Sequence, residues 1–379
     1  MPLIDVTVCG PGPALEPHWH DLVGRASPNV FMAPAALAAA DGLGVSDIQV
    51  LLAWEHDGAG KRLVGWWALQ QRSMAPGWPQ FLMGPPFSYA FLSDPVVEKG
   101  FASVVIPAFF DAIARAPHLP KLIRLQHLDA DSEAGAAVLD ACKNSYSTLV
   151  TERRRPFASQ EANLKKSGST RKKLRQDWNK LSALGRVEVV NERSAVPAQS
   201  AFETFLTLEA ASWKGAKGTA FLSRAADAGF ARRLAANMAA GQALSVALLQ
   251  LDGRAIAAQV LLYSGNMAYT WKTAYDQDFA KYSPGALLVE KVTGEVLAKP
   301  GITAIESCSL ESGFMGQLWE GRRTSVDLLV HVGRQRSLGL DILAGRERAY
   351  KTAKKARDQV RVAAQSVRAI VLAAFAGVT

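Results

Sequence analysis

The groups best suited to chemistry lie in residues 267–308. An aromatic, β-branched run indicates a strand, and it leads into Tyr282-Ser-Pro-Gly-Ala-Leu-Leu288. Ser283 is a typical helix N-cap, Pro284 suits the first helical position, and Gly285 lets a ligand approach the backbone. Free N–H groups and the positive helix end therefore converge there, which predicts an anion site for a group such as a pyrophosphate. The same residues also fit an ordinary capped helix.

Two carboxylates and two phenols accompany this turn. Asp276 and Glu306 close two strands that we expect to lie side by side, and such strand ends line the cleft of open sheets. Both are candidates for a general base or for orienting an amine. Tyr275 and Tyr282 are candidates for donating a proton. A turn residue, a surface ion pair and aromatic packing would explain the same four residues without catalysis.

Histidine and cysteine patterns exclude several other chemistries. His18 and His20 lack partners at metal-ligand spacing, so no metal site is predicted. Cys9, Cys142 and Cys308 form neither a zinc pattern nor a disulfide framework, which fits a reducing cytoplasm. No Gly-x-Ser-x-Gly sequence occurs, so no hydrolase triad is expected, and Cys308 is expected in the core.

Composition and charge set the class of protein. The chain has 379 residues, of which 49% are hydrophobic, enough for two domains with cores. No leader pattern is recognised at the N-terminus, and the apolar run 369–378 has about half the length needed to span a membrane, so a cytoplasmic protein is expected. The net charge of +9 is concentrated in residues 152–186 and 345–379. Basic helices there fit either an anionic partner or two solvated faces.

The chain contains an internal repeat in the order of its elements, which is typical of duplicated domains. Each half is expected to have a β-hairpin with an Asp-Gly turn, a further strand, a long helix and a short strand. The turns are Asp57-Gly58 and Asp252-Gly253. The expected ranges are 48–54, 63–70, 81–92, 96–114 and 122–126 in the first half, and 244–251, 255–263, the run from 267, the helix after Ser283 and 303–308 in the second.

The halves differ at the turn before the long helix. The second half has Tyr282-Ser-Pro-Gly285, whereas the first has Ser93-Asp-Pro-Val-Val-Glu98. The two carboxylates of the first half would repel a phosphate. We therefore expect the working anion site in the second half only. The first half would then serve as a wall or as part of an acceptor cleft.

The order and spacing of several short segments resemble the GNAT acyltransferase superfamily in its duplicated form. The similarity is to the BioF2-like, cellulose-biosynthesis-type acetyltransferases and their Fem-type aminoacyl transferase relatives. It covers about residues 168–323. The segments are Gly168-Ser-Thr-Arg-Lys-Lys-Leu-Arg-Gln-Asp-Trp178, Leu208-Glu-Ala-Ala-Ser-Trp-Lys-Gly215, Leu251-Asp-Gly-Arg-Ala-Ile-Ala-Ala-Gln259, Tyr282-Ser-Pro-Gly-Ala-Leu-Leu288, Glu306-Ser-Cys308 and Leu318-Trp-Glu-Gly-Arg-Arg323.

The resemblance implies an α/β (α+β) fold of tandem GNAT-like domains, each a mixed, mainly antiparallel, twisted sheet flanked by helices. Residues 1–155 would form a degenerate N-terminal domain, the first half. Residues 156–335 would form the catalytic domain, the second half, with a basic helix at 164–184. Residues 336–379 would form a basic, amphipathic C-terminal helix.

The resemblance also implies a thioester donor, acetyl-CoA or another acyl-CoA or acyl carrier, and no metal. The backbone N–H groups of Ser283, Gly285, Ala286 and Leu287 would receive its pyrophosphate, with Lys281 just upstream. The usual loop of the superfamily holds more glycines than this one.

Other residues are candidates for contacts with the acceptor. By resemblance, Trp213 and Lys214 lie in a loop that covers the acceptor site. Gln259 would face the interior of a strand, where it can hydrogen-bond a substrate amide. A packed or solvated role fits each of them as well.

Two aromatic-basic pairs complete the candidates. Trp271 and Lys272 alternate along one strand and are expected to face opposite sides, with Lys272 reaching a phosphate or a substrate carboxylate. Trp319 with Arg322 and Arg323 is a candidate cap over an acyl or acidic group. A strand-surface lysine and a packed loop are the alternatives.

These features predict an N-acyltransferase of a polysaccharide or envelope pathway. It would move an acetyl group from acyl-CoA to an amine of a small polar, sugar or envelope-precursor acceptor, by direct attack in a ternary complex. One alternative is a Fem-type transferase that uses aminoacyl-tRNA; otherwise no nucleic-acid partner is expected, because no RNA-binding motif occurs. The other is a non-catalytic protein whose helix at 346–375 contacts a protein or a membrane surface.

Overall fold

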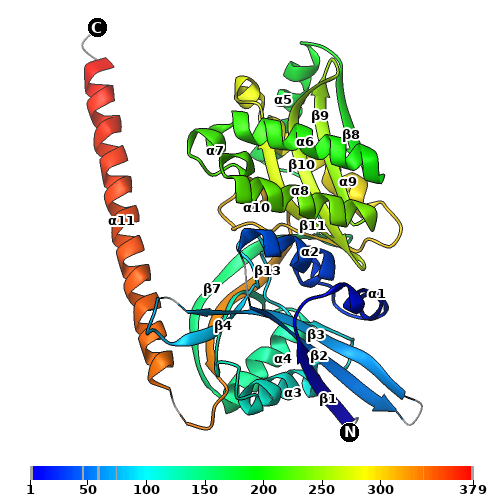
Figure 1. The fold of residues 1–379 in the computed structure, drawn as a ribbon. Coiled ribbons are helices and arrows are strands. Elements are labelled where there is room, and N and C mark those ends of the chain that lie inside the picture. The colour runs from blue at the N-terminus through cyan, green and yellow to red at the C-terminus, as the bar shows by residue number, and fades with distance from the viewer. Residues whose placement is uncertain (1–2, 45–46, 58–59, 74, 336, 377–379) are drawn as a thin grey trace.

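Runs of alternating or continuously apolar residues form the strands of one long, twisted sheet (Figure 1). The computed structural model describes residues 3–44, 47–57, 60–73, 75–335 and 337–376. The strands of the first half are β1 (Leu3–Cys9), β2 (Ile48–Asp57), β3 (Gly60–Ser73), β4 (Gln80–Gly84), β5 (Val96–Val97), β6 (Leu122–Asp129) and β7 (Tyr146–Ser159). Those of the second half are β8 (Val187–Glu192), β9 (Leu244–Leu251), β10 (Arg254–Ser264), β11 (Met267–Tyr275), β12 (Ala304–Glu306) and β13 (Arg322–His331).

Helices lie against this sheet in both halves (Figure 1). In the first half they are α1 (Glu16–Val23), α2 (Pro34–Ala40), α3 (Ala102–Arg115) and α4 (Glu133–Ala141). In the second they are α5 (Ser169–Ser182), α6 (Ala195–Ala211), α7 (Trp213–Ala216), α8 (Ala225–Ala240), α9 (Pro284–Leu297) and α10 (Phe314–Leu318). The chain ends in α11 (Leu338–Ala376).

The strand order repeats itself outward from the centre of the sheet. The order is β1-β2-β3-β4-β6-β13-β7-β12-β11-β10-β9-β8. Each half contains one parallel pair, β4–β6 or β11–β12, and a helix, α3 or α9, lies between its two strands in sequence. At the centre β13 pairs with β6 and β7 pairs with β12, so the halves exchange their last strands. The predicted tandem fold of mixed, mainly antiparallel sheets is confirmed.

One hydrophobic core joins the two halves. Phe87 and Tyr89 of the first half pack on Phe230 of α8, with ring centroids 5.7 and 5.2 Å apart. Phe31 meets Tyr269 of β11 at 5.9 Å. Aromatic side chains bury large apolar areas. These contacts therefore fix the first half against the face of the second half's sheet that carries α6 and α8.

A second core lies on the other face of the second half, around α9. Leu287 and Val292 of α9 are buried there with Leu174 and Leu181 of α5. The basic helix thus has a buried apolar side, whereas Leu184 is 53% exposed because the helix ends at Ser182. The basic helix consequently lies against the start of α9.

The sequence predicted the types of the helices and strands more accurately than the residues at which they begin and end. The helix predicted from residue 96 begins at Ala102, because Val96 and Val97 pair with β3 instead. The extended run predicted for 81–92 is a strand only up to Gly84. Strands β1 and β13 were not predicted. Gly58 of the predicted Asp-Gly turn lies outside the described residues.

The C-terminal helix is attached to the sheet by its first turns. Leu340 and Leu343 are buried with Leu329 of β13, and Arg124 of β6 lies 2.6 Å from the carboxylate of Glu347. The helix then extends beyond the sheet (Figure 1). The side chains of the predicted apolar run 369–378 lie outside those that the structure describes.

Candidate active site

The main candidate site is an opening in the sheet between β11 and β12. The two strands pair only where Met267 to Tyr269 lie opposite Ala304 to Glu306. Strand β12 then ends, whereas β11 continues to Tyr275. Within the described chain, residues 271–275 have a strand partner on one side only, which is β10. A free strand edge of this kind offers N–H and C=O groups to an extended ligand.

A β-bulge determines which side of the sheet the side chains along this edge face. Val260 of β10 lies opposite Lys272, and the next register pair skips Trp271. Both side chains reach Phe221: the Trp271 ring centroid is 5.3 Å from its centroid, and Lys272 Nζ is 5.0 Å away. The prediction that they face opposite sides is wrong, because the bulge inserts one residue into the alternation.

Aromatic faces, rather than a carboxylate, surround the ammonium group of Lys272. Its Nζ lies 5.2 Å from the ring centre of Tyr89, which comes from the first half, and 5.0 Å from that of Phe221. Burial lowers the pKa of Lys272, and the neighbouring Lys214 ammonium lowers it further. Nearby carboxylates, first among them Glu209, oppose this shift.

Trp213 and Lys214 lie in α7, beside the same edge of β11. Lys214 Nζ donates to the backbone oxygen of Thr273 and to the carboxylate of Glu209, both at 3.0 Å. A lysine, rather than a strand, thus satisfies one carbonyl of β11. Trp213 is 47% exposed, with Lys217 Nζ 4.8 Å from its ring centre. The loop predicted for this pair is a short helix, and its predicted role of covering the acceptor site stays a prediction.

The start of α9 offers fewer free N–H groups than the sequence predicts. The N–H of Ser283 donates to Ala280 O, and those of Ala286 and Leu287 both donate to Ser283 O. Of the four predicted donors, only Gly285 N–H has no acceptor recorded in the described chain. The predicted cradle is therefore corrected to a single free N–H, because a 3₁₀ turn runs straight into α9.

Positive charge at this helix start comes from side chains. Lys173 of α5 donates to Ser283 Oγ at 2.7 Å and also pairs with Asp177. Lys281 Nζ lies 5.0 Å from the ring centre of Tyr282. An anion at the start of α9 would therefore meet two lysines, one of them from the basic helix α5.

Helix α9 packs directly on the end of β11. A Cβ atom at Gly285 would lie 3.4 Å from Tyr275 Cδ1 and 3.6 Å from Thr273 Cγ2. Gln259 lies opposite Thr273 on β10 and is 1% exposed. Its Oε1 has no hydrogen-bond partner within the described residues. Gln259 therefore keeps the capacity predicted for it, which is to hydrogen-bond a ligand amide.

The predicted cluster of Trp319 with two arginines does not form a cap. Trp319 is fully buried, and its indole N–H donates to Thr293 Oγ1 at 3.0 Å. Arg322 pairs with Glu311 at 3.1 Å, whereas Arg323 lies against Phe157. The tryptophan is thus a core residue on the α9 side of the sheet.

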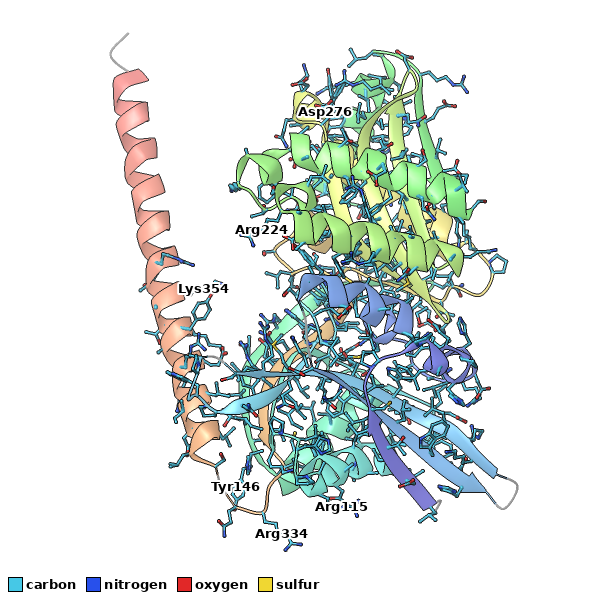
Figure 2. The ribbon with its side chains drawn as sticks, viewed as in Figure 1. Arg115, Tyr146, Arg224, Asp276, Arg334 and Lys354 are labelled. Atoms are coloured by element: carbon cyan, nitrogen blue, oxygen red, sulfur yellow. The ribbon has the colours of Figure 1, made fainter. Side chains whose placement is uncertain are left out.

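Asp276 and Glu306 lie apart, although their strands pair as predicted. Glu306 is opposite Tyr269, and Asp276 follows seven residues later, roughly 23 Å along the strand at about 3.3 Å per residue. Asp276 lies at the end of the second half remote from the first (Figure 2). It accepts the N–H of Asp278 and pairs with Arg254 at 2.5 Å. The prediction that both carboxylates flank one cleft is wrong, because β12 pairs only with the beginning of β11.

Glu306 belongs instead to a buried charged group at the junction of the halves. Arg155 is 2% exposed, and its Nε lies 2.9 Å from Glu306 Oε1. Glu306 also accepts the N–H of Cys308 at 3.1 Å. Burial raises the pKa of Glu306, and Arg155 opposes that shift. The Nη1 and Nη2 atoms of Arg155 have no acceptor within the described residues.

A cavity of about 510 Å³ opens beside this group, between the two halves. Asp94 and Asp129 of the first half and Tyr269 and Glu306 of the second line it. Asp94 accepts the N–H of Asp129 at 3.0 Å, and Asp129 pairs with Arg323 at 2.8 Å. Burial, and then the charge of Asp129, raise the pKa of Asp94 to about 7.

Three residues of this region were not predicted from the sequence. Tyr89 follows a Gly-Pro-Pro loop that suggests only irregular chain. Phe221 lies in a short segment without periodicity. Arg155 is the last of three consecutive arginines in a basic stretch that fitted either an anionic partner or a solvated face. Only the fold brings Tyr89 and Arg155 to strands of the second half.

Three further features bear on function: a buried thiol, the grouping of metal-ligand residues, and the length and polarity of the helices. Burial and Glu306 raise the pKa of the Cys308 thiol well above its usual range, so it stays protonated. In the part of the chain that the structure describes, no three His, Cys, Asp or Glu residues are grouped so that they could hold a metal ion. None of its described helices has the length and apolar character needed to cross a membrane.

Comparisons with known proteins match a family model to part of the chain and find the same fold over most of its length. Residues 168–308 match the family model described as an acetyltransferase (GNAT) domain. No curated protein matches the sequence. FemX is similar in structure, with a TM-score of 0.53 and 12% identity over 82% of this chain and 94% of its own. A conserved protein of unknown function from Bacteroides thetaiotaomicron VPI-5482 has a TM-score of 0.51 and 11% identity over 86% and 100%. These two likenesses show a shared fold.

The raised pKa of Asp94 predicts how stability changes with pH. The folded state keeps this proton up to about pH 7, whereas the unfolded chain releases it near pH 4. The free energy of unfolding should therefore fall as pH rises through this window, by up to about 1.4 kcal/mol per pH unit. Urea unfolding at several pH values should show this fall, and Asp94→Asn should remove it. The surface control Asp111→Asn should keep the fall in unfolding free energy. If Asp94→Asn shows the same fall, the assignment to Asp94 is contradicted.

The two predicted carboxylates should differ sharply when neutralised. Glu306→Gln leaves the buried guanidinium of Arg155 unpaired and should cost about 3 kcal/mol of unfolding free energy. Asp276→Asn keeps a capping side chain and loses one ion pair with a mostly exposed arginine, so its cost should stay below about 1 kcal/mol. Urea unfolding measures both. Adding Arg155→Met to Glu306→Gln should restore stability, and equal losses in the single variants would refute the distinction.

Proposed function

Because residues 168–308 match the family model of an acetyltransferase (GNAT) domain and the chain has a duplicated fold, we propose that the protein transfers an acyl group from acyl-CoA to an amine. The free edge of β11 is the observation that carries the proposal. The donor's extended arm contains amide groups, and these can add to a strand edge as a peptide does. Acetyl is the simplest acyl group for this reaction.

The donor would lie along β11 from the start of α9 to the bulge. Its phosphates would meet Gly285 N–H, Lys173 and Lys281, with Tyr275 and Tyr282 beside the arm. Its thioester would then reach the end of the edge that faces the first half. Burial of the arm between α9 and the helices of the other face would hold the carbonyl in place for attack.

The acceptor amine would enter from the junction of the halves. The cavity beside Glu306 has several carboxylates in its wall, which suit an amine. Glu306 lies where β11 and β12 diverge and is our choice for orienting the amine and receiving its proton. Asp276 lies too far along β11 for that role. A sugar or envelope precursor as acceptor, and a place in polysaccharide biosynthesis, rest on the family analogy.

Calorimetry with CoA tests the donor site. Wild-type protein should bind CoA, and Gly285→Trp should weaken binding at least about tenfold, because its side chain would fill the space beside Tyr275 and Thr273. Gly294→Trp is the matched control, since the same helix has open space there. Equal affinity in wild type and Gly285→Trp would contradict the proposed site.

A second candidate follows from the basic surface of α5. A hollow of about 590 Å³ has Lys166, Arg171, Lys172 and Arg175 among its lining residues. Such a surface suits the phosphates of a tRNA-linked donor. Absence of CoA binding together with salt-sensitive binding of tRNA would favour this candidate. Absence of both would favour a non-catalytic interaction protein.

A further inference from the structure

The two lysines beside the free edge of β11 differ in one respect. Lys214 has a carboxylate and a backbone carbonyl as partners, both at 3.0 Å. Lys272 is largely shielded as well, yet no ion pair or hydrogen bond of its ammonium is recorded within the described residues. A shielded cation without a polar partner is costly unless a bound group supplies one. Lys272 is therefore the group at this edge that is available to a substrate.

The first half holds the aromatic surface that faces Lys272. The indole N–H of Trp271 donates to Tyr89 O at 3.0 Å, and the Tyr89 ring stacks on Phe230 at 5.2 Å. Phe221 lies 4.8 Å from Tyr89 and faces the same ammonium. The rings fix the position of Nζ and keep water away, which strengthens its electrostatic effect on a neighbour.

Charged and titratable groups reach Lys272 from every element around it. They are Lys214 of α7, Glu209 of α6, Asp227 of α8, Cys308 after β12 and Tyr89 of the first half. Burial and Lys214 lower its pKa, while Glu209, Asp227 and Cys308 act in the opposite sense. The net result is an ammonium that gives up its proton more readily than an exposed lysine does.

We infer that Lys272 is a catalytic residue of the proposed acyl transfer. Its ammonium would bind the thioester carbonyl oxygen as that atom becomes an oxyanion, and would then protonate the leaving thiolate. The inference rests on the proposed function, because it uses the same donor path. The bulge that carries Lys272 lies at the inner end of that path, where the thioester would stop. Tyr89 makes the first half part of the site.

The step balances within the site. The acceptor nitrogen forms a bond to the carbonyl carbon, and the carbonyl electron pair moves to oxygen beside Lys272 Nζ. Collapse re-forms the carbonyl and breaks the carbon–sulfur bond, and the thiolate takes a proton from Lys272. Glu306 receives the proton that the acceptor nitrogen loses, and a proton passed from Glu306 through solvent returns the neutral Lys272 amine to its ammonium form. The products are an amide and a free thiol. A lowered pKa of Lys272 lies closer to the pKa of the leaving thiol, which favours this proton transfer.

Trace labelling of lysines tests whether Lys272 meets the donor. Each lysine is acetylated with trace acetic anhydride from about pH 6 to about pH 11, and peptide mass spectrometry gives its rate. Lys272 should titrate below the usual range of lysines. CoA should slow the labelling of Lys272, and of Lys173 and Lys281 at the phosphates, but not that of Lys299, which pairs with Glu295. If calorimetry shows CoA bound while Lys272 remains equally reactive, the inference is wrong. If CoA does not bind at all, the proposed function itself fails.

A change of leaving group tests the proton transfer. Lys272→Met and Lys272→Arg are compared with the control Lys299→Met, using acetyl-CoA and the acetyl thioester of a thiophenol, with glucosamine as amine probe. Lys272→Met should lower kcat with acetyl-CoA by about 10²–10⁴-fold at unchanged KM. The loss should be much smaller with the thiophenyl ester, whose thiolate needs no proton to leave. Lys272→Arg keeps the positive charge, so its kcat with acetyl-CoA should lie between those of the wild type and Lys272→Met. Equal losses with both esters, or no loss, would overturn the proton-donor role.

Discussion

The exchange of last strands at the centre of the sheet is the constraint on which the candidate site depends. Strand β13 returns from the second half to pair with β6, and β7 of the first half pairs with β12. Strand β12 has only three residues and is paired on both edges. Its position is therefore set jointly by the two halves. Beyond Phe157, β7 pairs with β13 instead, and β12 ends while β11 continues, which leaves the opening in the sheet.

The first half thus has a wider role than that of a degenerate copy of the second half. It supplies β7, the Tyr89 ring over the bulge and the Asp94 carboxyl in the cavity wall. The buried pair of Arg155 and Glu306 lies where these parts meet. A buried ion pair adds little net stability, but removing one partner is costly. The junction is therefore polar, tightly constrained and adjacent to the opening, as a site for a polar acceptor requires.

The sequence predicted the kind of fold better than the contacts of individual residues. Periodicity and turn residues located most elements, including the strand and helix around Ser283. The sequence could not reveal the bulge at Trp271, because one inserted residue leaves the composition of a strand unchanged. Nor could it bring Tyr89 to Lys272, which are 183 residues apart. Trp319 was a candidate for capping a ligand, because its hydrogen-bond partner Thr293 lies 26 residues away on α9.

Hydrogen–deuterium exchange with and without CoA tests the central claim most directly. If the donor lies along the free edge of β11, CoA should slow exchange of amides in residues 270–287, where that edge and the start of α9 lie. The matching strands of the first half, β4 and β6, should be unaffected. Slower exchange confined to residues 166–179 on α5, or no change anywhere despite CoA binding shown by calorimetry, would contradict the account.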